Sequence, residues 1–152
     1  MEKTSAGFTL IEILLVVAIL AILAGIVIIA VNPARQLSQA TNSQRRADVQ
    51  TILNAVYQHA LDHGGTVLTE ITTDTQEVCA LGTGSTASTS CAGKAHLGNL
   101  IHNQLYLSGF PTDPGGATTT NGTGYYIKKS ANGRITVKAP AAQLGQVISA
   151  TR

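Results

Sequence analysis

The chain has 152 residues, which is enough for one small globular domain. Charged residues make up 12% of it, about half the usual share of roughly 25%. The net charge of +2 is too small to indicate electrostatic binding of nucleic acid. This composition excludes an ordinary cytosolic enzyme, a disordered chain and a polytopic membrane protein, and it predicts one membrane-embedded helix joined to one small polar domain.

The apolar residues are concentrated in residues 8–31, a run of 24 in which Glu12 is the only charged side chain. A helix of that length rises about 36 Å and can cross a hydrocarbon core of about 30 Å. A cleaved secretory signal fits less well, because its apolar part usually has about 7–15 residues before a small-residue cleavage site. On length alone, a plain single-span membrane anchor is the favoured interpretation.

Glu12 argues against a plain anchor. A carboxylate in a membrane helix costs about 2.5–3.5 kcal/mol at the bilayer centre and less near the interface, so it indicates a functional site. No other residue of the run can neutralise it. The countercharge is expected from another chain or from a newly made N-terminal amine.

Residues 3–12 read KTSAGFTLIE, which resembles the class III signal of type IV pilins and type II secretion pseudopilins. The resemblance implies that a membrane aspartyl peptidase cuts between Gly7 and Phe8 and then N-methylates Phe8. It also implies that Glu12 pairs with the amine of Phe8 in a neighbouring subunit during assembly. The leader departs from the usual form because Glu2 stands beside Lys3, which weakens its orientation signal.

Three small residues, Ala18, Ala21 and Gly25, share one face of the apolar run. They either allow neighbouring helices to approach closely or reflect the ordinary composition of spanning helices.

Pro33 lacks a backbone donor and disfavours helix at Asn32, so a kink is expected there. Helical spacing of apolar residues then resumes and ends at about His63, before Gly64 and Gly65. The chain is therefore divided into a leader (1–7), a membrane or filament-core helix (8–31), an amphipathic helix half (32–63) and a polar head (64–152).

The head is predicted to be rich in β-structure. Its expected elements are an edge strand at 66–71, a loop at 82–93, a short helix within 97–107, a hairpin of strands 124–129 and 134–138, and a final strand at 146–151. The fold class is α+β, with a long N-terminal helix packed on an antiparallel sheet of three or four strands. This order also matches pilin-like subunits.

Cys79 and Cys91 are the only cysteines. Outside the membrane they are expected to form a disulfide, which would contribute on the order of 3 kcal/mol; free thiols are the alternative in a reducing envelope.

Two groups of residues raise the question of a metal. His59, Asp62 and His63 fall on one helical turn, where the favoured reading is a solvated helix end. Asp113 lies in an Asp-Pro turn related to one in major pseudopilins, some of which bind calcium nearby. Only Asp113 supplies a local carboxylate, so a structural turn is the default. No cofactor is expected.

Six basic residues offer a weakly basic face: Arg45, Arg46, Lys128, Lys129, Arg134 and Lys138. Pilins of uptake systems contact DNA, but charges that keep the protein soluble are the simpler explanation, and nucleic acid is not expected as a partner.

No catalytic pattern is present in the sequence, and the chain is expected to be a substrate of enzymes rather than an enzyme. The resemblance implies a structural subunit of a type IV pilus-like filament. Its implied partners are further copies of itself, the peptidase and methyltransferase, an inner-membrane assembly platform and minor pilins. The precursor would cross the cytoplasmic membrane once before it joins an extracellular pilus.

Three alternatives stay open. The first is a pseudopilin of a type II secretion or competence system, in an envelope pseudopilus. The second is a membrane-tethered binding domain that does not polymerise. The third is a secreted enzyme cut near residues 30–34.

Overall fold

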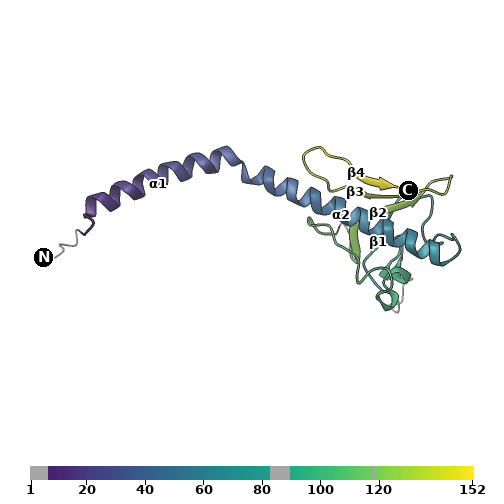
Figure 1. Ribbon diagram of the computed structural model, residues 1–152. Helices are drawn as coiled ribbons and strands as arrows, with labels where there is room; N and C mark the ends of the chain where they lie inside the picture. Colours follow the sequence, from purple (N-terminus) through teal and green to yellow (C-terminus); the bar gives the residue numbers. More distant parts are fainter. Residues whose placement is uncertain (1–6, 83–89, 118) are drawn as a thin grey trace. The chain divides into compact units, whose positions relative to one another are not determined.

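The computed structural model describes residues 7–82, 90–117 and 119–152 (Figure 1). The chain divides into two compact units, Met1–Leu37 and Ser38–Arg152.

Helix α1 covers Leu10–Val31 and none of its 22 residues is buried. It is long and apolar enough to cross a membrane. It ends at Asn32, whose backbone is left-handed with φ 46°, a conformation that Asn tolerates better than most residues. Pro33 follows and cannot donate to the preceding turn. The helical chain is interrupted at this point for both reasons.

Helix α2 covers Pro33–Asp62. Proline is well suited to the first position of a helix, where its missing N–H has no partner to lose. The helix ends before Gly64 and Gly65, which have φ of 64° and 85°. The N–H of Gly65 donates to the carbonyl of Ala60 at 2.7 Å, which closes the helix end.

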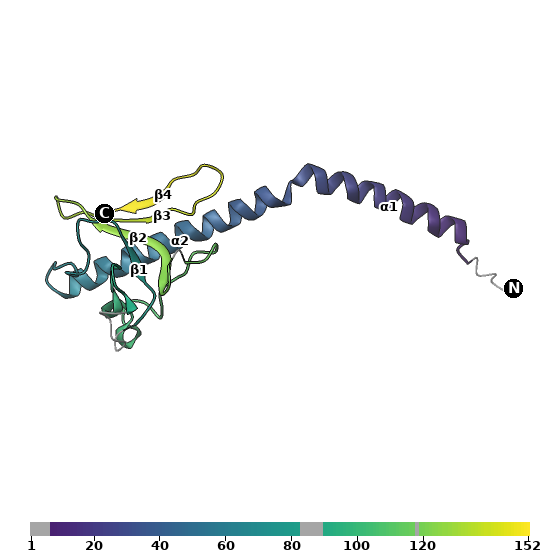
Figure 2. The same cartoon turned by 180° about the vertical axis from the view of Figure 1, so that it is seen from behind.

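The head contains one four-stranded sheet, which Figures 1 and 2 show beside α2. Its strands are β1 (Gln76–Cys79), β2 (Gly122–Lys129), β3 (Ile135–Ala139) and β4 (Ile148–Thr151). They pair in the order β1-β2-β3-β4, and every pairing is antiparallel. The α+β class and the four-stranded antiparallel sheet confirm the sequence prediction.

The central hairpin joins β2 to β3 through the predicted turn, residues 130–133. Lys129 pairs with Ile135 as the first rung after the turn. Gly133 has φ 82°, which explains why the turn needs glycine there, and its N–H donates to the carbonyl of Ser130 at 2.9 Å.

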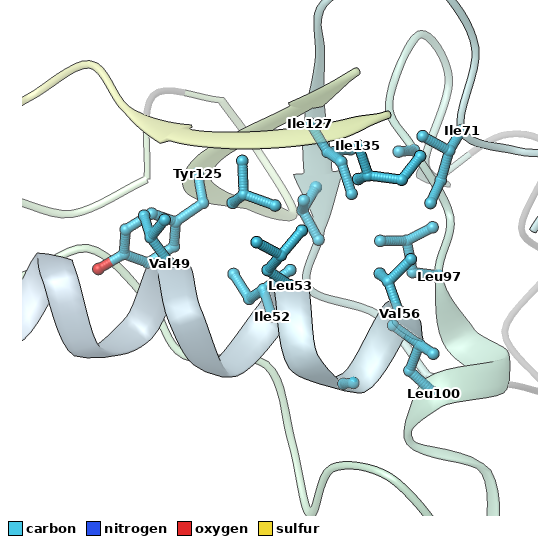
Figure 3. Close-up of a cluster of buried hydrophobic side chains, with 14 of the residues drawn as sticks. Val49, Ile52, Leu53, Val56, Ile71, Leu97, Leu100, Tyr125, Ile127 and Ile135 are labelled. Carbon is cyan, nitrogen blue, oxygen red and sulfur yellow. The ribbon is translucent and has the colours of Figure 1, made fainter. Parts of the chain in front are cut away.

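The core lies between one face of α2 and the inner face of the sheet (Figure 3). Helix α2 contributes side chains at helical spacing, among them Val49, Ile52 and Val56. The facing side chains come from the strands and from the segments between α2 and β2: Ile71, Leu97, Leu100, Tyr125, Ile127 and Ile135. The head is thus built around α2.

Two sequence predictions for the segment between α2 and β2 need correction. Residues 66–71 form no strand; Leu68 and Ile71 are buried one turn apart, and the N–H of Ile71 donates to the carbonyl of Leu68 at 3.2 Å. The apolar side chains fill the core from a turn, so the first strand is β1 instead.

The helix expected within 97–107 consists of two short 3₁₀ helices, η1 (Gly98–Leu100) and η2 (His102–Gln104). Asn103 and Gln104 have φ of 51° and 55°, which prevents one continuous helix. Of the loop expected at 82–93, residues 83–89 lie outside the described residues.

A disulfide joins Cys79 at the end of β1 to Cys91. The segment that follows Cys91 returns along the outer edge of β1. There Cys79 donates to the carbonyl of Ala95, and Ala95 donates to the carbonyl of Glu77, both at 2.9 Å. The disulfide therefore anchors the segment that covers this edge of the sheet.

Replacing both cysteines by serine should lower the free energy of unfolding of the head by about 3 kcal/mol, because the loop between them gains freedom in the unfolded chain. Urea unfolding of the full-length protein in detergent, followed by tyrosine fluorescence, measures this. Reduced wild-type protein is the matched control and should unfold at the same urea midpoint as the double variant. A midpoint unchanged by either treatment would contradict the structural role of the disulfide.

Candidate processing and assembly site

The N-terminus of α1 is held by a reciprocal pair of hydrogen bonds between Thr9 and Glu12. The backbone N–H of Glu12 donates to the Thr9 hydroxyl at 3.3 Å, and the N–H of Thr9 donates to Glu12 Oε2 at 3.5 Å. This capping box satisfies two backbone donors that the first helical turn leaves without partners. Glu12 therefore has a local role in starting the helix in addition to its charge.

The Gly7–Phe8 peptide bond lies before the helix begins. Neither residue is in helix or strand, and the Phe8 side chain is exposed. Around Gly7, a side chain would meet no other atom within 4 Å. A bond in exposed, irregular chain can be drawn extended into a protease cleft, which a bond inside a helix cannot without unwinding.

The rest of α1 presents apolar side chains on all sides. Ala18, Ala21 and Gly25 are exposed along it, and a side chain at Gly25 would also meet open space. The structure thus leaves room at these positions for another helix to pack.

Residues 3–28 match the family model described as the prokaryotic N-terminal methylation motif. The chain carries a prepilin-type motif. The motif is that of type IV pilin and pseudopilin precursors, and it contains Gly7, Phe8, Glu12 and most of α1. It supports a membrane-anchored precursor of pilin or pseudopilin type. Neither the curated proteins nor the solved structures contain a match to this chain.

In the head, Asp113 is held by a buried arginine. Arg45 Nε and Nη2 donate to the two carboxylate oxygens of Asp113 at 2.7 and 2.8 Å, and the N–H of Gly115 donates to Oδ1 at 2.7 Å. The side chains of this ion pair are 1% and 0% exposed. Asp113, the candidate calcium ligand, is thus already neutralised by Arg45, which favours the interpretation as a structural turn.

The surroundings of this ion pair favour the charged form of both side chains. Burial alone would raise the pKa of the Asp113 carboxyl, but the hydrogen bonds from Arg45 and Gly115 and the charge of Arg45 outweigh it and lower that pKa. The hydrogen bond to Asp113 raises the pKa of Arg45. Nearby, Tyr125 donates to Asp48 at 2.6 Å, and its burial, followed by this bond, raises the pKa of the phenol.

The ion pair belongs to a row of polar contacts along α2 that the sequence did not reveal. Arg45 Nη1 also donates to Asn42 Oδ1 at 3.1 Å. The sequence does not reveal whether a helical arginine faces solvent or a buried carboxylate. For Arg45 the carboxylate partner, Asp113, is 68 residues away in the sequence. The Thr9–Glu12 box did have a readable signal, the T-x-x-E spacing.

Of the six residues of the predicted basic face, four are exposed and Lys129 is half-buried. Arg45 is buried and does not join them, whereas Lys128, Arg134 and Lys138 are exposed. Arg46 is also exposed and donates to Gln146 Oε1 at 2.6 Å. The basic face is therefore smaller than the sequence alone indicated.

His59 and His63 stack at the end of α2 with ring centroids 4.0 Å apart. Burial, followed by the charge of His63, lowers the pKa of His59. Asp62 accepts a hydrogen bond from Tyr106 at 2.9 Å. Among residues 7–82, 90–117 and 119–152, no three His, Cys, Asp or Glu side chains are grouped to hold a metal ion.

Replacing Arg45 by methionine should destabilise the head by about 3–5 kcal/mol, because it leaves the buried Asp113 carboxylate without a countercharge. The double variant Arg45→Met with Asp113→Leu is the matched control and should recover much of that loss, since no buried charge is left alone. Urea midpoints of the three proteins at neutral pH decide this. A double variant no more stable than the single one would show that the residues act independently.

The same ion pair predicts a dependence on acid. Because the pKa of Asp113 is lower in the folded state, its contribution to stability is complete above its unfolded pKa of about 3.9 and is lost as pH falls through the folded value. Urea midpoints measured from pH 6 to pH 2 should therefore fall more steeply for the wild type than for the Arg45→Met, Asp113→Leu variant. Parallel curves would assign the acid sensitivity to other carboxyls.

Proposed function

We propose that this chain is the structural subunit of a type IV pilus-like filament, cut after Gly7 and polymerised through α1. The observation that carries the proposal is the prepilin-type motif on a helix that has a single carboxylate and no buried residue. The leader, helix halves and head would correspond to residues 1–7, 8–31, 32–63 and 64–152.

Assembly would exchange one apolar environment for another. Before assembly, α1 is covered by lipid; afterwards, it is covered by α1 helices of neighbouring subunits. Because the apolar surface is buried in both states, helix packing and polar contacts rather than the hydrophobic effect choose the geometry.

Glu12 would supply the polar contact that fixes the register. Cleavage before Phe8 creates an ammonium one residue before Thr9, whose N–H already donates to the Glu12 carboxylate in the precursor. In an apolar bundle an ammonium and a carboxylate from neighbouring chains neutralise each other, and neither is tolerated alone. Only one axial position brings the two charges together.

The subunit would act with the prepilin peptidase and methyltransferase, an inner-membrane assembly platform and minor pilins. A pseudopilin of type II secretion or competence is the alternative within the same mechanism. The absence of tryptophan from the chain, and so from the turn at Asp113, favours the pilus. The motif is that of structural precursors, and no catalytic role is proposed.

The first test is the N-terminus of the protein taken from its native cell envelope. Intact mass and N-terminal sequencing should show a chain that starts at methylated Phe8. A Gly7 variant with a bulky side chain should remain full length. A wild-type chain that still starts at Met1 would instead support a tethered domain that does not polymerise, and a start near residues 30–34 would support a secreted protein.

Glu12→Ala should abolish filament assembly or shift its register, because the carboxylate that pairs with the Phe8 amine is lost. The head should stay folded, because Glu12 lies in α1, outside the head. Glu12→Gln is the informative control, since glutamine can keep the capping box but cannot pair with an ammonium. Sheared filaments are counted by electron microscopy and the head is checked by its urea midpoint. Normal filaments from Glu12→Gln would reduce the role of Glu12 to helix capping.

A further inference from the structure

In the unit Ser38–Arg152, the large apolar side chains that the structure describes as exposed fall into two pairs. Leu61 and Leu105 are 77% and 69% exposed, and Leu144 and Val147 are 48% and 91% exposed. Leu61 and Leu105 line one surface groove together with Gln58, Asp62 and Tyr106, here named the Leu61 groove. Leu144 and Val147 belong to residues 140–147, the β3–β4 loop.

The two pairs lie at opposite ends of α2 within the head. The β3–β4 loop is bonded to the early part of the helix, where Asn42 Nδ2 donates to the carbonyl of Gln143 at 2.9 Å. The Leu61 groove contains the last turn, where Tyr106 donates to Asp62. At about 1.5 Å per residue, Asn42 and Asp62 are about 30 Å apart along the helix. Figures 1 and 2 both show the loop, in yellow, away from the C-terminal end of α2.

Left-handed backbone occurs at or beside one member of each pair. Leu144 has φ 58°, which is unfavourable for a side chain of its size. Asn42 bonds both backbone groups of Gln143, as donor to its carbonyl and as acceptor from its N–H, each at 2.9 Å. At the other end, Asn103 and Gln104 are left-handed immediately before Leu105. In the absence of a partner, Leu144 and Leu105 are therefore already exposed on local backbone of defined conformation.

The charges around the two pairs are opposite. Asp62 is the charged side chain of the Leu61 groove. The hollows on either side of Val147 are lined by Arg46 on one side and Lys138 on the other, and none of their lining residues is acidic. A β3–β4 loop placed in the Leu61 groove would bring apolar side chains together and set cations near a carboxylate.

We infer that the β3–β4 loop of one subunit docks in the Leu61 groove of a second copy of this chain. Because the contact joins two different surfaces at opposite ends of the head, it is heterologous and can repeat without closing, as a filament requires. Two side chains on each face bury far less than the roughly 1,000 Å² that a stable interface needs. The contact therefore depends on the high local concentration of heads along the filament and rests on the proposed function.

Cysteine cross-linking in intact filaments tests this contact directly. The native cysteines are joined to each other, so Leu61→Cys and Val147→Cys introduce the only free thiols. Filaments are assembled from a mixture of the two single variants, one of them tagged, and oxidised. The expected product is a cross-linked heterodimer, while a chain that carries both substitutions should give a ladder of multimers. In the matched control, Lys128→Cys replaces Val147→Cys and should give no dimer; Lys128 is the exposed residue of β2.

Each outcome bears on a different claim. Filaments that form without the heterodimer overturn the docking contact and leave the proposed function standing. Homodimers from Leu61→Cys filaments alone also overturn it, because they require a self-complementary contact. If the wild-type chain is neither cut nor assembled, the proposed function fails and the contact falls with it.

A second pair of variants tests the sign of the charge. Val147→Asp and Val147→Lys alter the same exposed position, so neither should disturb the fold of the head. Val147→Asp places a negative charge opposite Asp62 and should reduce the yield of sheared filaments several-fold relative to Val147→Lys. Equal filament yields from the two variants would show that Asp62 takes no part in the contact. A lower yield for Val147→Lys than for Val147→Asp would overturn the proposed pairing of surfaces.

Discussion

The apolar surface of α1 is the constraint on which the rest of the structure depends. None of the residues from Leu10 to Val31 is buried, so every apolar side chain of this helix needs cover from lipid or from other chains. That requirement explains why charge is excluded from the helix after Glu12, and why Glu12 itself sits at the first turn, where the backbone of Thr9 offers it a hydrogen bond. The helix is therefore suited to a membrane or to a bundle of apolar helices.

Helix α2 has a different role, because the small head has few apolar residues for its core and is packed around this helix. Its apolar face fills the space beneath the sheet, and its polar face reaches loops that are distant in sequence. Arg45 fixes the turn at Asp113, and Asn42 fixes the β3–β4 loop at Gln143. Buried polar contacts of this kind need particular partners in particular places, so they specify where each loop lies more than they add to stability.

The sequence predicted those elements whose signal is local. The apolar run, the Asn-Gly turn between β2 and β3 and the end of α2 each depend on neighbouring residues, and the structure agrees with them. Prediction from the sequence failed where a contact between residues distant in the chain determines the local structure. Residues 66–71 have the composition of a strand, but Leu68 and Ile71 serve the core from a turn. Arg45 has the spacing of a surface charge, yet its partner is Asp113, which only the folded chain brings near.

The covered edge of β1 has a consequence for how these heads tolerate crowding. Where protein domains are held close together, an open strand edge recruits strands of neighbouring molecules. At β1 the segment around Ala95 occupies that edge and the disulfide keeps it there, while β4 at the opposite edge has only four residues. While the disulfide is intact, the segment around Ala95 stays on this edge of the sheet, so the head presents little open strand edge with which a strand of another molecule could pair.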